Sequence, residues 1–307
     1  MMLDSAAVLD TDTLRKQPDY GFAFKAPQAF LQRINPSNPK DPLLLQIRPD
    51  PQEGQEVAGF KTDPVGDLHK NPIPSLLHKY HGRVLLMASP RCDIHCRYCF
   101  RRHFPYQEQI NRRHWQEALD YIRRDDSIHE VILSGGDPLT LNSEALLQLL
   151  AEIEQIPQVK TLRFHSRTPI AIPEKPVHRS IIQWAEKTRL NAVMVIHCNH
   201  PQELNQETAA LFTAYRQSGI HLLNQSVLLK QINDSIEALE ALSHKLFSQG
   251  VLPYYLHQLD RVSGSAHFEV NQATAQALHT SLRERLPGYL LPKLVQEISG
   301  EPYKTPL

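Results

Sequence analysis

Three of the four cysteines stand close together in the sequence, as Cys92, Cys96 and Cys99 in a C-x3-C-x2-C spacing. Thiolates are soft ligands that suit iron–sulfur clusters and zinc. Three thiolates on one loop leave one iron of a [4Fe–4S] cluster without a protein ligand, and that iron is free to bind a small molecule. Structural zinc is the alternative, but it requires a closed set of four Cys or His ligands, usually in two separated pairs. The spacing therefore favours a cluster with one open iron.

Further polar residues follow strand-length apolar runs later in the chain. They are Ser134-Gly135-Gly136-Asp137, His165, Arg167, His197, Gln225, His257 and Asp260. A Gly-Gly-Asp sequence is often only a turn, and a single histidine is often only a satisfied core residue. Adjacent glycines, however, let backbone approach a ligand closely because no side chain intervenes. Their repeated position after an apolar run predicts that these residues share one site.

The apolar runs predict β-strands that begin near residues 84, 130, 160, 192, 221 and 252. The starts are 46, 30, 32, 29 and 31 residues apart, and each gap holds a helical pattern. Repeated right-handed βα units place parallel strands inside and helices outside. Six repeats rather than eight predict an α/β fold, a partial (β/α)6 TIM-type barrel. In such barrels the reactive groups lie at the carboxyl ends of the strands.

Individual helices can be placed from their apolar stripes and end signals. Asp234 is expected to cap a helix that stops at Gly250, and other helices are expected at 202–218 and 271–285. Residues 1–80 are rich in proline and turn signals and lack a core of their own, so we expect an irregular, partly helical N-terminal extension packed on the barrel. Residues 81–287 form the predicted barrel, and residues 288–307 form a last strand, at 289–295, and a tail.

Composition limits the classes of function. The 307 residues suffice for one large α/β domain, and 33 Lys and Arg balance 33 Asp and Glu, so no net charge attracts nucleic acid or membranes. The first ten residues lack the basic start of a secretory signal, and no apolar stretch approaches the roughly 20 residues of a membrane span. Cysteines used as ligands rather than disulfides indicate a reducing cytoplasm, and Cys198 is expected to be a buried thiol.

The three-cysteine spacing resembles that of the radical S-adenosylmethionine (SAM) enzymes, in which the open iron binds SAM and the cluster cleaves it to a 5′-deoxyadenosyl radical. From about residue 41 onward the chain resembles one family of these enzymes, the lysine 2,3-aminomutases, and within it the branch that serves elongation factor P. The resemblance is carried by residues 77–81, 96–106, 134–139, 223–229, 253–257 and 300–306. The family combines SAM with pyridoxal 5′-phosphate (PLP) and moves an amino group between the α and β carbons of lysine.

The resemblance implies roles for residues around the two organic cofactors. Lys304 stands where the family has the lysine that holds PLP as a Schiff base. Its competitor is Lys293, which lies in a strand-like run and is expected to face solvent. The family's glycine-rich stretch before this lysine is reduced here to Gly300. Lys79 matches the residue that meets the PLP phosphate, and the residues that match the SAM and cofactor pocket are Tyr98, Ser134, Gly135, Gly136, Asp137, His165, Arg167, His197 and Gln225.

Lysine as substrate requires complementary charge at both ends. Arg101 holds the family position that binds the α-carboxylate, for which the planar guanidinium is suited. Asp260 and Glu297 match positions that bind the ε-ammonium, and buried acids that face a cation stay ionised. The alternative for these two acids is an ordinary surface charge pair.

The resemblance implies that the radical takes a hydrogen from Cβ of PLP-bound L-α-lysine, yielding β-lysine, expected as the R form. A separate ligase would then attach β-lysine to a lysine of elongation factor P. One alternative is a catabolic lysine 2,3-aminomutase without that link. A glutamate enzyme would need basic groups in place of Asp260 and Glu297. A nucleic-acid module is disfavoured by the zero net charge, despite a local cluster of arginines. The sequence does not determine whether the protein forms a homo-oligomer.

Overall fold

The computed structural model describes residue 9 and residues 11–307, and one mixed β-sheet organises this part of the chain. Its nine strands are hydrogen-bonded in sequence order, from β1 to β9. Strands β2 to β8 are parallel, whereas β1 and β9 pair antiparallel at the two edges. The strands are Leu76–Tyr80 (β1), Arg83–Ser89 (β2), Glu130–Gly135 (β3), Thr161–Ser166 (β4), Asn191–His197 (β5), His221–Val227 (β6), Leu252–His257 (β7), Lys293–Gln296 (β8) and Thr305–Pro306 (β9).

The six predicted barrel strands are β2 to β7, and the sheet stays open between β1 and β9, which confirms the partial barrel. The last predicted strand was placed too early. Residues 288–290 form a 3₁₀ helix, and β8 begins at Lys293. Pro292 lacks an N–H for the ladder, so the strand starts directly after it. The edge strands β1 and β9 were not predicted from the apolar pattern.

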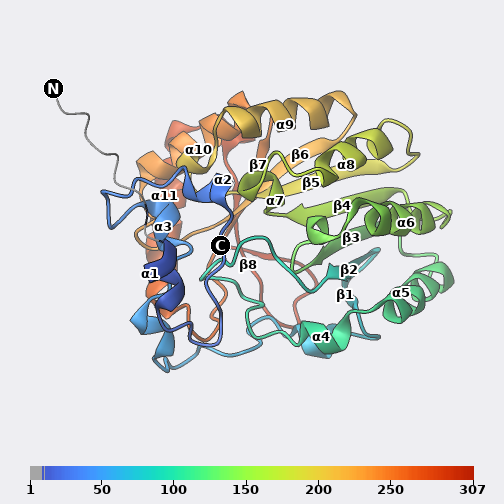
Figure 1. The fold of residues 1–307 in the computed structure, drawn as a ribbon, viewed down its shortest axis with the longest axis horizontal. Coiled ribbons are helices and arrows are strands. Elements are labelled where there is room, and N and C mark those ends of the chain that lie inside the picture. Colours follow the sequence, from blue (N-terminus) through green and yellow to red (C-terminus); the bar gives the residue numbers. More distant parts are fainter. Residues whose placement is uncertain (1–8, 10) are drawn as a thin grey trace.

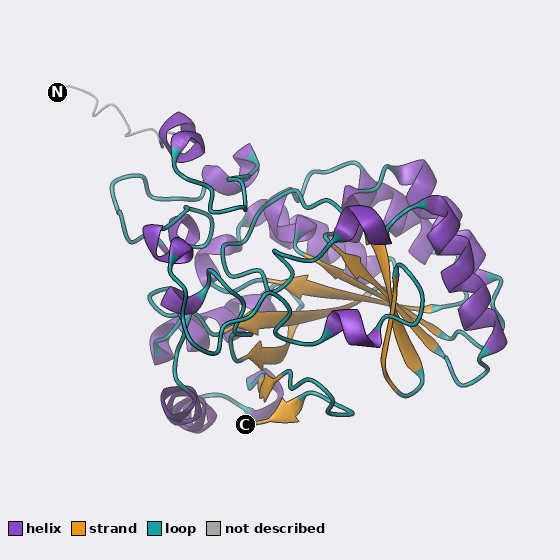
Figure 2. Ribbon diagram, turned by 90° about the horizontal axis from the view of Figure 1, so that it is seen from below, coloured by secondary structure: helices purple, strands orange, loops and turns teal. Residues whose placement is uncertain are grey.

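Helices connect the parallel strands and cover the outer side of the curved sheet (Figures 1 and 2). The longer ones are α5 (Arg112–Arg124), α6 (Ser143–Glu154), α8 (Val177–Ala185), α9 (Gln206–Gln217), α10 (Ile236–Ser248) and α11 (Gln272–Arg285). In α6, for example, Leu146, Leu149, Leu150 and Ile153 are buried at helical spacing. The apolar stripe of the sequence therefore faces the sheet.

Short helical segments complete the chain. They are α1 (Thr11–Lys16), α2 (Gln28–Leu31), α3 (Pro42–Leu45), α4 (Tyr106–Gln109), α7 (Thr168–Ala171), η1 (Pro51–Gly54), η2 (Asp67–Lys70), η3 (Pro138–Thr140), η4 (Pro201–Glu203), η5 (Ala266–Phe268) and η6 (Gly288–Leu290). Among the helices of the described residues, none has the length and apolar character needed to cross a bilayer. The predicted absence of a secretory signal concerns residues 1–10, nearly all of which lie outside the described part.

Two predicted helix ends differ from the structure. The cap of α10 is Ser235 and not Asp234, because the Ser235 hydroxyl accepts the amide of Ala238 at 3.2 Å. The predicted helix at 202–218 is divided, since Asn205 caps a new helix by accepting the amide of Thr208 at 3.0 Å. Gly250, the predicted end of α10, has a left-handed φ of 78°.

The N-terminal segment packs into the core of the barrel. Phe30, Leu43 and Ile47 belong to the same buried cluster as Val131 and Leu162 of the central strands. The segment therefore shares a buried apolar cluster with the barrel strands.

A buried ionic group joins this segment to the cysteine loop. The carboxylate of Glu53 accepts Arg97 Nε at 2.8 Å, Arg97 Nη2 at 2.5 Å and Arg102 Nη2 at 2.7 Å. All three side chains are almost fully buried. Buried guanidinium groups require such a partner, since an unpaired charge in the interior is very costly. The extension thereby fixes the loop that carries the three cysteines.

Candidate active site

The predicted site residues meet at the carboxyl ends of the parallel strands. His165 lies near the end of β4, His197 ends β5, and Gln225 pairs in register with His197 from β6. Burial is the main cause that lowers the pKa of His165 and His257 well below the ordinary value, and Lys304 lowers both further. The C-terminal tail therefore lies against the same end of the barrel as the strand-end residues.

The three cysteines of the predicted cluster loop are reduced and half-buried. Burial raises the pKa of all three thiols, that of Cys99 to about 11, and the neighbouring cysteines raise those of Cys92 and Cys99 further. Among the described residues, no three His, Cys, Asp or Glu side chains converge on a single ion. In a [4Fe–4S] cluster each thiolate binds a different iron, so the three thiols need not converge on one point. Three soft donors on one loop therefore fit a cluster.

The glycine pair at the end of β3, with Gly135 in the strand and Gly136 directly after it, packs against the backbone at the start of the cysteine loop. Gly136 N donates to Ser89 O at 2.8 Å, and Asp137 N donates to Arg91 O at 2.7 Å. A Cβ on Gly136 would stand 2.4 Å from Arg91 O, and one on Gly135 would stand 2.7 Å from Ser89 O. The glycines are thus required because two backbones pack together, whatever ligand they also meet.

Asp137, predicted to contact the cofactor, is satisfied by the protein. Its buried carboxylate accepts the amides of Leu139, Arg167 and Thr168 at 2.8–3.1 Å, and the hydroxyl of Ser166. It therefore ties the end of β3 to the end of β4. Burial raises its pKa.

Arg167 extends behind the cysteine loop in a buried network. Its Nη1 donates to Cys96 Sγ at 3.1 Å and to the Tyr98 hydroxyl. Its Nη2 donates to Gln46 at 2.8 Å and to Glu203 at 3.0 Å. The positive charge thus lies against one predicted cluster ligand, and two residues that sequence reasoning missed hold it there.

Two buried histidines in this region have a ring nitrogen without a protein partner. These are Nε2 of His165 and Nε2 of His197. Burial lowers the pKa of His197 to about 3, so its ring is neutral near pH 7. A buried polar atom without a partner is unfavourable unless a ligand satisfies it. The two imidazoles are therefore suited to face a polar cofactor.

A chain of ion pairs links the predicted PLP and substrate residues. Lys304 pairs with Glu297, which also accepts Lys79 at 3.3 Å and the Tyr80 hydroxyl at 2.8 Å. Lysines on both sides outweigh the effect of burial and lower the pKa of Glu297 to about 2. Glu297 is thus ionised throughout the physiological range.

The same chain continues to the predicted carboxylate-binding residue. Asp67 pairs with Lys79 at 2.6 Å and with Arg101 Nε at 2.6 Å. Arg101 Nη1 reaches Ser134 Oγ at 3.5 Å, beside the glycine pair. Asp67 was missed because it lies in the irregular N-terminal segment. The sequence feature that could have indicated Asp67 is its place as an acidic residue directly after the turn residues Pro64 and Gly66.

Asp260 adds a second acid near Lys304. Burial raises its pKa to about 7, whereas Lys304 lowers it. The structure therefore brings Asp260, Glu297 and Lys304 together. The competing lysine, Lys293, is exposed as predicted and is not part of this buried group. Cys198 is fully buried, also as predicted.

Comparisons with known proteins agree with this geometry. Residues 81–182 match a family model described as a 4Fe-4S single cluster domain. The L-lysine 2,3-aminomutase of Haemophilus influenzae is 46% identical over 285 residues, which cover 92% of this chain and 84% of the relative. That of Escherichia coli K12 is 45% identical over 287 residues, covering 93% and 83%. That of Clostridium subterminale is 33% identical over 282 residues, covering 91% and 67%.

An open, parallel α/β barrel with a three-thiol loop inside a 4Fe-4S domain defines an iron–sulfur enzyme of the radical SAM class. The chain belongs to the lysine 2,3-aminomutase family, and it is an isomerase. The predicted resemblance to the lysine 2,3-aminomutases is confirmed, whereas the branch that serves elongation factor P stays a prediction. The predicted cofactor set of cluster, SAM and PLP agrees with this membership.

The close packing of Gly136 on Arg91 can be tested through the cysteine loop. We expect Gly136→Ala to displace the loop, because its Cβ would overlap the Arg91 carbonyl, and to reduce the iron bound after anaerobic reconstitution several-fold. Iron and acid-labile sulfide are measured per chain. Gly288→Ala is the matched control, since nothing lies within 4 Å of the added carbon. Equal iron in both variants would contradict the role of this contact.

The raised pKa of Asp260 predicts a pH dependence of stability. An exposed aspartate has a pKa of 3.8, so the folded protein holds the Asp260 proton more tightly than the unfolded chain does. Its contribution therefore becomes unfavourable as the pH rises from about 4 to about 7. Relative to wild type, Asp260→Asn should gain free energy of unfolding across that range, by at most about 4 kcal/mol.

Urea unfolding of the cofactor-free protein at constant ionic strength measures this difference. Asp126→Asn serves as the control, because that side chain is exposed. A gain for Asp260→Asn that is the same at every pH would show that the carboxyl does not titrate in this range.

Proposed function

We propose that this protein converts L-α-lysine to β-lysine with SAM and PLP, and that the product, in the R form, serves the modification of elongation factor P in the cytoplasm. The observation that carries the proposal is the continuous ionic chain Lys304–Glu297–Lys79–Asp67–Arg101. This chain links the three cations that we assign to PLP, to its phosphate and to the substrate carboxylate, and their proximity supports the proposal.

The three cysteines would hold the cluster, with SAM on the open iron. His165 and His197 each have a free buried ring nitrogen, and these nitrogens are suited to polar groups of the cofactors. Arg167 hydrogen-bonds to both Tyr98 and Asp137, so these three residues would hold the loops that surround the cofactors. Ser134 and Gly135 at the end of β3, Gly136 directly after it, and Gln225 in β6 would contact the same cofactors.

Lys304 is assigned as the residue that binds PLP covalently, and Lys79 as the partner of its phosphate. When bound, PLP supplies a carbonyl carbon that accepts an amine and delocalises an unpaired electron. Glu297 now pairs with both lysines. Once the Lys304 nitrogen is engaged with the cofactor, one Glu297 oxygen is free for another ammonium group.

Charge at the two ends of the pocket selects lysine. Arg101 keeps two terminal guanidinium nitrogens that can meet an α-carboxylate as a fork. At the other end Glu297 and Asp260 suit the ε-ammonium, whose charge would in turn lower the pKa of Asp260 and ionise it. A glutamate side chain would meet two acids there and be repelled.

One assay tests the reaction. Anaerobically reconstituted protein with SAM, PLP, dithionite and L-lysine should form β-lysine, measured by chromatography with a chiral standard. Replacing Lys304 by Ala should abolish both product and the absorbance of covalently bound PLP. Lys293→Ala, which changes an exposed lysine, should keep both. If Lys293→Ala loses them and Lys304→Ala does not, the assignment of the PLP lysine is wrong.

The link to elongation factor P rests on the motif Arg102-His103-Phe104-Pro105-Tyr106 and on the reduced glycine stretch before Lys304. In cells that lack this protein, elongation factor P should lose the mass of one lysyl residue on its modified lysine. Intact-protein mass spectrometry measures this, and re-expression of wild type, but not Lys304→Ala, should restore it. An unchanged mass would instead favour the catabolic alternative.

A further inference from the structure

Within the part of the chain that the structure describes, Asp67 is the one acid in contact with both cations assigned to bind anionic groups, Lys79 and Arg101. Its Oδ1 lies 2.6 Å from Lys79 Nζ, and its Oδ2 lies 2.6 Å from Arg101 Nε. Its side chain is 1% exposed. Burial raises the pKa of this carboxyl, but Arg101 and Lys79 outweigh burial and hold the pKa below its ordinary value. Asp67 is therefore a permanent negative charge.

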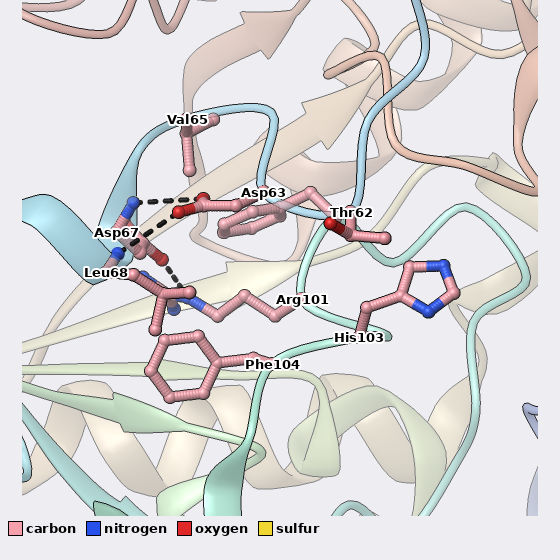
Figure 3. Close-up of a pocket in the computed structure, with 9 residues that line it drawn as sticks. Thr62, Asp63, Val65, Asp67, Leu68, Arg101, His103 and Phe104 are labelled. Atoms are coloured by element: carbon pink, nitrogen blue, oxygen red, sulfur yellow. Dashed lines mark hydrogen bonds and ion pairs between the residues drawn. The ribbon is translucent and has the colours of Figure 1, made fainter.

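The turn that carries Asp67 is itself fixed. Asp63 accepts the amides of Asp67 at 3.0 Å and of Leu68 at 3.2 Å, as Figure 3 shows. Gly66 adopts a left-handed φ of 66°, and a Cβ there would stand 2.4 Å from Ser299 Oγ. This turn thus packs against the tail that leads to Lys304. These contacts fix the backbone of the turn, and the backbone in turn positions the Asp67 carboxylate.

Arg101 would have room to move if it lost this partner. A hollow beside it lies between the segment 62–68 and the residues that follow Cys99, and Asp67 and Arg101 form part of its wall. Figure 3 shows the pair between Leu68, Val65 and Phe104. Asp67 holds only Nε, so the two terminal nitrogens of Arg101 stay available, and Nη1 points to Ser134.

We propose that Asp67 is a positioning residue that orients Arg101 for the substrate carboxylate while keeping Lys79 on the phosphate side. The inference rests on the proposed function. Asp67 also separates two cations that would otherwise repel each other across a dry pocket. Because it contacts the Nε edge, it does not compete with the substrate for the terminal fork.

The test compares wild type with Asp67→Asn and Asp67→Glu, each as holoenzyme with cluster and PLP. Without SAM, the affinity for L-lysine is measured from the absorbance change of bound PLP. The same titration is made with 1,5-diaminopentane, which is lysine without its carboxylate. We expect Asp67→Asn to weaken lysine binding about tenfold or more, since a charge-assisted contact is lost, and to leave the diamine affinity unchanged. Turnover should show a raised KM and a smaller change in kcat.

Asp67→Glu keeps the charge and should recover part of the affinity for lysine. Glu117→Gln, which removes an exposed pair with Arg113, is the control and should match wild type. Unchanged lysine affinity, or an equal loss for lysine and diamine, overturns the proposal. If Asp67→Asn does not accumulate as holoenzyme, Asp67→Glu is judged by the same lysine-to-diamine ratio. Failure of wild type to form β-lysine would refute the proposed function instead.

Discussion

Charge compensation at the barrel mouth is the constraint on which the site depends. Three cations, Lys304, Lys79 and Arg101, lie within one ion-paired chain, and such a group folds only if acids separate them. Glu297 from the end of β8 and Asp67 from the N-terminal segment supply those acids. A cation-rich pocket suits two anionic groups, a phosphate and a carboxylate. The same ion pairs therefore stabilise this end of the barrel and, in the proposed function, position the cations for these two groups.

A second constraint acts on the cysteine loop, which is held on both sides. Backbone contacts with the glycine pair after β3 fix its start, and the buried pairs of Glu53 with Arg97 and Arg102 fix its middle. Arg167 then reaches Cys96 from behind. Three separate parts of the chain thus hold the loop that carries the predicted cluster ligands. The irregular N-terminal extension is thus part of the active site's support.

Much of the architecture was predictable because it depends on local sequence patterns. The period of about 30 residues and the apolar stripe of α10 predicted the parallel strands and their helices. The edge strands were not predictable in this way. β9 is only two residues long. β1 contains polar residues and forms a strand because it pairs with β2. Helix caps at Ser235 and Asn205 were decided by which side chain could reach an amide, a choice that composition leaves open.

The sequence by itself determined the three soft thiols at cluster spacing and the period of the strands, and through its resemblance to the family it predicted a PLP lysine in the tail and an arginine and acids for a substrate charged at both ends. Only the tertiary structure decided their partners. Asp67, Glu53, Gln46 and Glu203 come from segments far from the residues they bind, and their local sequence does not indicate those partners. Ion pairing depends on distance in space, and the sheet fixes that distance only when all its strands are assembled.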